Sequence, residues 1–168
     1  MTTLRISKIV LVSLVAFSAL AQQTATLESL SVCELLRDAP RYNGQRISLR
    51  GVYHRGGHGE LFLRGEGCEG ILKTGGYVWE NLIYIDDRLP EAQRLMEKFN
   101  AAVALERERM GPQTRTWKIW ITFAGKFVTE DPLKLFPSSR SPMGFGPFFA
   151  SPGQLFIDDM LKVEFEIQ

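Results

Sequence analysis

Hydrophobic and polar residues alternate along five separate stretches of the chain, in the period-two pattern of strands that bury one face. In the first stretch Ile47, Leu49 and Tyr53 share one phase, and in the fourth Ile119 and Ile121 do the same. Each stretch is bounded by residues that favour turns, such as Gly, Pro, Asn and Asp. We therefore expect strands at residues 46–53, 60–64, 82–86, 117–128 and 155–167.

The last stretch contains one residue that conflicts with its pattern. Leu155, Ile157 and Leu161 share a phase, and Asp159 has that phase too. A straight strand would carry the Asp159 carboxylate into the core, which is unfavourable for a charge without a partner. We therefore expect a bulge or turn at residues 158–160 that returns Asp159 to water.

We expect one helix before the first strand and a second between the third and fourth strands. Ser31 and Glu34 fit a capping box, followed by apolar residues at helical spacing up to Pro40, which ends the segment. Pro90 opens a longer amphipathic helix that Gly111 stops, since a proline amide is not needed at the first helical position.

The resulting order is a short helix, three strands, a helix and two strands. This order predicts a mainly β fold: a five-stranded OB-like barrel with a short N-terminal helix and a helix between strands three and four. Gly51 and Gly125 fall inside the first and fourth strands, where a strongly curved barrel needs bends. All five strands are compatible with antiparallel pairing. An ordinary α+β sandwich is the rival fold.

The amino-terminal residues have the features of a secretory leader. Arg5 and Lys8 precede an uncharged apolar run, and Ala19 and Ala21 place an A-x-A pattern before a cut at Gln22. The apolar run is shorter than the roughly 20 residues that span a bilayer. We expect a signal peptide at residues 1–21, a single OB-like domain at 22–168, export to the periplasm or the medium, and no stable membrane insertion after cleavage.

Charge and cysteine content refine this picture. The formal net charge is +1 and becomes slightly negative once Arg5 and Lys8 leave with the leader, so nucleic acid is not an expected partner. The chain has two cysteines, Cys33 and Cys68. In an oxidising compartment these favour a disulfide, because no C-x-x-C motif is present and neither cysteine is close in sequence to an activating histidine.

Several segments resemble a group of small exported bacterial proteins without an assigned activity. The resemblance covers most of the mature chain and lies in the segments VCELLRDAPRYNGQRISLRGVY, LFLRGEGCEGIL, GYVWENLIYI and MGFGPFFASPGQLFI. Its most specific elements are Cys33, the turn at Asn43 and Gly44, Gly51, Cys68, Trp79 and the loop at residues 144–146. The resemblance implies export and paired cysteines, and it implies no catalytic residue.

Both histidines lie in one glycine-rich segment, RGVYHRGGHGELFLRG. His54, His58 and Glu60 form H-x3-H-x-E, a set of ligand types that suits zinc. In a hairpin loop, however, a four-residue spacing does not place two imidazoles on one face, and a solvated turn explains the segment as well. We expect no bound metal or other cofactor, with a metal-dependent enzyme using these three residues as the alternative.

One mixed surface of cations and aromatic rings follows from the strand phases. OB-folds stack bases or sugars on such surfaces. The loops at the strand ends would bring His54, His58, Phe145, Phe148 and Phe149 to its border. In a competing interpretation the amino-terminal helix or the long loop covers Tyr84 and Trp120. Ser48 lies on this surface between Arg46 and Arg50. The expected ligand-binding residues are Arg46, Arg50, Phe62, Arg64, Tyr84, Lys118 and Trp120.

These patterns favour an exported, non-enzymatic binding or interaction module. Its expected ligand is an oligosaccharide, a peptide or a partner protein, found as a polymer or protein of the cell envelope. Besides the metal-dependent enzyme, a purely structural envelope component remains as an alternative.

Overall fold

The computed structural model describes residues 27, 29–74, 77–111, 117–129, 144–146 and 151–167. The expected leader and the two phenylalanines at 148 and 149 lie outside these residues. The strands are β1 (Ser29–Ser31), β2 (Arg46–Arg55), β3 (Leu61–Arg64), β4 (Lys73–Thr74), β5 (Tyr77–Val78), β6 (Leu82–Asp86), β7 (Trp117–Thr129) and β8 (Gly153–Ile167). The helices are α1 (Val32–Arg37), α2 (Ala39–Tyr42) and α3 (Pro90–Met110).

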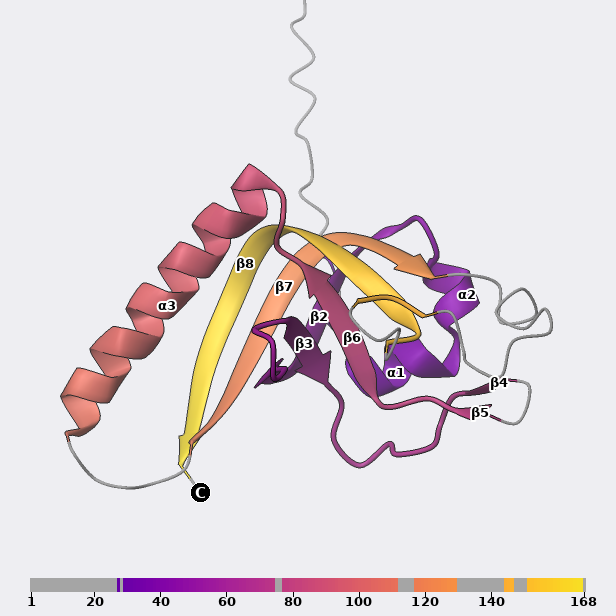
Figure 1. Cartoon of the computed structure of the whole chain (residues 1–168), viewed down its shortest axis with the longest axis horizontal. Coiled ribbons are helices and arrows are strands. Elements are labelled where there is room, and N and C mark those ends of the chain that lie inside the picture. Colours follow the sequence, from indigo (N-terminus) through magenta and orange to yellow (C-terminus); the bar gives the residue numbers. More distant parts are fainter. Residues whose placement is uncertain are drawn as a thin grey trace, which may run out of the picture.

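Five of the strands close a barrel, as the sequence predicted (Figure 1). The order is β2, β3, β6, β8, β7 and back to β2. All neighbours are antiparallel except β6 and β8, which are parallel. With α3 inserted between the third and fourth barrel strands, this is the OB-like arrangement. The sequence pattern was compatible with antiparallel pairing of all five strands, so the parallel β6–β8 pair is a difference from that expectation. Outside the barrel, β1 pairs with β2 in parallel.

The predicted bulge is present in β8. The register between β7 and β8 shifts twice, so Met160 pairs with Phe123 and Ile157 pairs with Gly125. Asp159 is exposed as expected, and Met160 packs against the core. Leu161, expected to face inward with the other apolar residues of β8, is 49% exposed because the bulge reverses the phase there.

Glycines inside β2 and β7 allow the close approach of other chain segments. A Cβ atom at Gly51 would lie 2.9 Å from the Leu63 Cβ and from a methyl of Val32. A Cβ at Gly125 would collide with the backbone of β8. Both glycines are therefore required by packing.

The helices lie at opposite ends of the barrel. α1 has the predicted capping box, in which Ser31 Oγ accepts from the Glu34 amide and the Glu34 carboxylate accepts from the Ser31 amide. α3 runs beside the C-terminal half of β8, as Figure 1 shows. Its buried stripe of Ala92, Met96, Phe99 and Val103 joins the barrel core, and the rings of Phe99 and Tyr53 lie 4.7 Å apart.

The predicted disulfide joins Cys33 at the start of α1 to Cys68, with the two Cα atoms 5.7 Å apart. It packs on Gly65, where an added Cβ would lie 2.7 and 2.9 Å from the two sulfurs. The Gly65 amide donates to the Asn81 carbonyl at 2.8 Å, and the Asn81 side chain donates to the Gly65 carbonyl. The disulfide therefore fixes α1 to the end of β3.

None of the helices among the described residues combines the length and the hydrophobicity that a bilayer crossing requires.

Candidate functional site

Arg50 and Trp120 form the centre of a polar cluster on the outside of the barrel. The row Arg64, Val52, Trp120 and Glu164 crosses four neighbouring strands in register. The Arg50 guanidinium carbon lies 4.1 Å from the centroid of the Trp120 ring, a cation–π contact. We call the surface that carries Arg50, Arg64, Lys118 and Trp120 the outer face.

Carboxylates hold the Arg50 and Trp120 side chains in place. Arg50 Nε donates to Glu164 at 3.2 Å, and Lys162 Nζ lies 2.9 Å from the other oxygen of that carboxylate. The hydrogen bond from Lys162, and then that from Arg50, lower the pKa of Glu164. Glu164 therefore stays ionised beside Arg50 at neutral pH.

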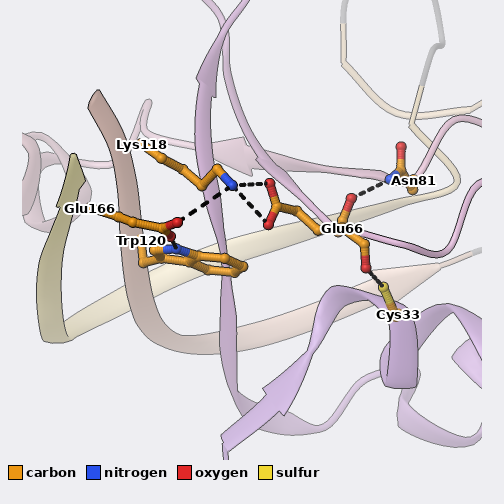
Figure 2. Close-up of polar contacts among 7 residues, drawn as sticks. Cys33, Glu66, Asn81, Lys118, Trp120 and Glu166 are labelled. Carbon is orange, nitrogen blue, oxygen red and sulfur yellow. Dashed lines mark hydrogen bonds and ion pairs between the residues drawn. The ribbon is translucent and has the colours of Figure 1, made fainter. Parts of the chain in front are cut away.

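Lys118 and the indole nitrogen of Trp120 share a second pair of carboxylates, drawn in Figure 2. Lys118 Nζ lies 2.8 Å from a Glu66 oxygen and 3.9 Å from a Glu166 oxygen. The bond to Glu66 raises the pKa of Lys118. Trp120 Nε1 donates to Glu166 at 2.7 Å. The Trp120 donor and the Lys118 charge are thus both already engaged.

Arg64 differs from its neighbours on the outer face. It is exposed, and no carboxylate of the described residues pairs with it. Burial lowers the pKa of the neighbouring His54, and the charge of Arg64 lowers it further. Among the described residues, Arg64 is therefore a cation without an ion pair at one end of this row.

Arg64 lines at least three cavities of the described residues, and two of these also share Glu66 and lie on the outer face. The first, which we call the β7 cavity, has a volume of about 310 Å³, and its lining includes Val52, His54, Arg64, Glu66, Trp117 and Lys118. The second, the α1 cavity, has a volume of about 250 Å³ and lies between α1 and the barrel. Its lining includes Cys33, Arg37, Arg50, Arg64, Glu66 and Trp120.

Not all of the predicted surface is open. Phe62 is 6% exposed, so it is not a free stacking platform. Its ring lies between those of His54 and Tyr84, with centroids 6.4 and 5.7 Å away. Tyr84 is half-buried beneath Gly146, where a Cβ would lie 2.9 Å from the tyrosine ring. For Tyr84 the structure thus agrees with the competing interpretation, in which the long loop covers it.

Two further residues of that prediction are also engaged or buried. Arg46 forms a two-pronged ion pair with Asp158, at 2.9 and 2.8 Å, and lines neither cavity. Ser48 is fully buried, and its hydroxyl has no hydrogen-bond partner among the described residues. Phe145, expected near the border of the surface, pairs through its backbone with Ser151. Of the predicted residues, Arg50, Arg64, Lys118 and Trp120 line the two cavities of the outer face.

The alternative metal site does not assemble in the described part of the chain. His54 lies on β2 and packs on Phe62, whereas His58 lies in the following turn. The Glu60 carboxylate accepts from the His58 backbone amide at 3.2 Å. Among the described residues, no three His, Cys, Asp or Glu side chains lie close enough together to hold an ion. The H-x3-H-x-E spacing is therefore accounted for by a hairpin turn.

Comparisons with protein-family models, curated proteins and solved structures found no match. The functional interpretation rests on the geometry of the chain itself.

Sequence reasoning missed the acidic half of the site and one of its cations. Glu164 and Glu166 alternate with apolar residues in β8, a pattern that places them on the outer side of the barrel. Their partners follow only from the register of β8 against β7. Arg37 belongs to the last turn of α1, where a basic residue also favours the helix dipole, so nothing in the sequence pointed to a cavity.

Proposed function

We propose that the chain is an exported OB-like binding module, without a catalytic role, that holds an extended ligand against its outer face. The ligand is an oligosaccharide, a peptide or a segment of a partner protein of the cell envelope. The observation that carries the proposal is the pair of adjoining cavities that share Arg64. A ligand that enters both would follow the row of residues across β3, β2 and β7.

The rigidity of this surface supports a binding role. Arg50, Lys118 and Trp120 are held by three carboxylates from β8 and from the loop after β3. Side chains that are already ordered lose less conformational entropy when a ligand binds. The α1 cavity is smaller than the roughly 300 Å³ at which pockets for drug-sized ligands begin, and the β7 cavity is at that limit, so two neighbouring residues of a polymer fit the pair.

Export is supported by the disulfide and by the leader pattern in the sequence. Disulfides persist in oxidising compartments and are rare in the cytosol. Expression of the full chain in a bacterial host tests this part directly. We expect the periplasm or the medium to contain a chain that begins at Gln22. An uncleaved chain retained in the cytosol would contradict export.

Binding is tested by titration with defined envelope material. The probes are a peptidoglycan digest and a set of ten-residue peptides, followed by two-dimensional NMR. We expect wild-type protein to bind at least one probe below millimolar ligand, and the double variant R50A/W120A to bind it at least about tenfold more weakly. No binding at millimolar ligand, or equal binding by the double variant, would overturn the proposal.

The matched control removes one arginine and one apolar side chain from another surface. The variant R94A/L105A changes two exposed positions of α3 that line neither cavity. It should bind as wild type does. Circular dichroism of all three proteins verifies that a loss of binding is not a loss of fold.

A further inference from the structure

The α1 cavity combines three arginines with a single aromatic ring. Arg37 comes from the last turn of α1, Arg50 from β2 and Arg64 from the end of β3. The disulfide fixes α1 against β3, so the spacing of these arginines is set by the fold. The following inference rests on the proposed function, because it names the ligand of the same outer face.

The carboxylates that border this cavity are already occupied. Glu34 accepts from the Ser31 amide and from the Ser31 hydroxyl, both at 2.7 Å, as part of the α1 cap. Glu66 is held by Lys118. Both acidic groups that line the cavity thus have their partners within the fold.

The arginines are only partly balanced. Arg50 pairs with Glu164, but neither Arg37 nor Arg64 has an ion pair with a carboxylate of the described residues. The Arg37 charge also acts on Glu34 one turn away and lowers its pKa, but two guanidinium groups without an ion pair among the described residues still attract an anion to the cavity between them. Guanidinium binds carboxylate through two parallel hydrogen bonds, which makes the carboxylate the best-matched anion.

The state of Trp120 decides between a sugar and a peptide. A sugar-stacking site needs an open aromatic face, and saccharide hydroxyls pair well with a free indole N–H. Arg50 lies over the Trp120 ring at 4.1 Å, and the indole N–H already donates to Glu166. The groups left to recognise a ligand in the α1 cavity are therefore charges, not a stacking platform.

The adjoining β7 cavity has a different character. Val52, Trp117 and Ile119 contribute apolar surface to it, and Arg64 and the Lys118-bound Glu66 line both this cavity and the α1 cavity. An extended chain with a carboxylate in one cavity can place a neighbouring apolar side chain in the other. We propose that the outer face binds an acidic peptide segment, with a Glu or Asp carboxylate between Arg37 and Arg64 and an apolar neighbour in the β7 cavity.

Calorimetric titration with three probes tests this. The first is a capped hexapeptide in which Glu alternates with Leu; the second carries Gln in place of Glu; the third is trigalacturonate, a carboxylated sugar. We expect the Glu peptide to bind, and the Gln peptide to bind at least about tenfold more weakly. We also expect affinity for the Glu peptide to fall with added salt.

The variant R37Q/R64Q should lose at least about tenfold in affinity for the Glu peptide and little for the Gln peptide. Its matched control, R94Q/K98Q, removes two positive charges from exposed positions of α3 and should bind as wild type does. Because all four positions are exposed, the thermal midpoints should agree, which separates binding from folding.

The outcomes distinguish this inference from the proposed function. Equal binding of the Glu and Gln peptides, or an unchanged affinity in R37Q/R64Q, overturns the carboxylate site while leaving a binding face in place. Tighter binding of trigalacturonate than of the peptide overturns the peptide assignment. Failure of all three probes, together with failure of the peptidoglycan digest, overturns both proposals.

Discussion

The guanidinium of Arg50 on β2 lies over the indole ring of Trp120 on β7, with 4.1 Å between its carbon and the ring centroid. Arg50 also pairs with Glu164 on β8, so one side chain connects three neighbouring barrel strands. Arg50 therefore covers a face of the Trp120 ring, which the sequence pattern predicted to be available for stacking. It thereby changes the expected chemistry of the outer face from stacking to charge.

A double-mutant cycle measures that contact. The variants R50A, W120L and R50A/W120L are compared with wild type by urea denaturation. We expect a coupling free energy of about 0.5–1 kcal/mol, the usual size of a partly exposed cation–π pair. The cycle removes the separate contributions of the Glu164 and Glu166 bonds. A coupling energy near zero would show that Arg50 and Trp120 do not interact in solution.

The disulfide should contribute strongly to stability. Replacement of both Cys33 and Cys68 by Ala should lower the free energy of unfolding by about 3–4 kcal/mol, because the unfolded chain regains the entropy of a loop of this length. Reduction of wild type with dithiothreitol should give a similar loss, measured by denaturant unfolding. A loss below about 1 kcal/mol in both cases would contradict this role for the disulfide.

Gly51 should not tolerate a methyl group. In G51A the new Cβ would meet the Leu63 Cβ and a Val32 methyl at 2.9 Å and the Arg64 carbonyl oxygen at 3.1 Å, so we expect a loss of about 1–3 kcal/mol. The control is G57A, in the exposed turn before β3, where a Cβ would meet nothing within 4 Å. G57A should be neutral or slightly stabilising. Equal denaturation midpoints for the two variants would refute the close approach.

Stability at acid pH should depend on Asp86. This buried carboxylate accepts from the Arg88 side chain and from Gln154, and the Arg88 hydrogen bond is the main cause that lowers its pKa. Because the folded-state pKa of Asp86 is lower than its unfolded-state pKa, near 4, the ionised carboxylate stabilises the fold at pH values above the unfolded-state pKa. This stability is lost as the pH falls through the folded-state pKa.

The variant D86N should therefore be less stable than wild type at pH 7, and the difference should shrink as the pH falls from about 5 towards 2. E97Q, which alters an exposed carboxylate on α3, is the control. Thermal midpoints across this pH range provide the measurement. A difference between D86N and wild type that is the same at pH 7 and pH 2 would contradict the assignment.

The five barrel strands were predictable because each is long enough to show its alternation. β1, β4 and β5 have only two or three residues, too few to establish a period, and they were missed. The parallel pairing of β6 with β8 was not predictable either, since alternation is the same in parallel and antiparallel neighbours. The bulge in β8 was predictable from the cost of burying Asp159. The exposure of Leu161 that results from the bulge was not predicted.

The sequence predicted which side chains of the candidate site face outward, but not which of them other segments bury. Arg50, Arg64, Lys118 and Trp120 face outward as their positions in the strands required. Phe62 has the same outward phase, yet His54 and Tyr84 bury it, and Gly146 from a distant segment covers Tyr84. Such cover depends on tertiary contacts, which a strand pattern does not contain.

In the proposed complex, Arg37 and Arg64 together bind an anionic group of the ligand on the outer face. The most direct test of this binding is the NMR signals of the arginine Nε–H groups during titration with the Glu-containing peptide. We predict that the Arg37 and Arg64 signals shift with the same saturation curve while the Arg94 signal on α3 stays in place. Equal small shifts of all three signals, or no shift at millimolar peptide, would show that Arg37 and Arg64 do not bind the carboxylate.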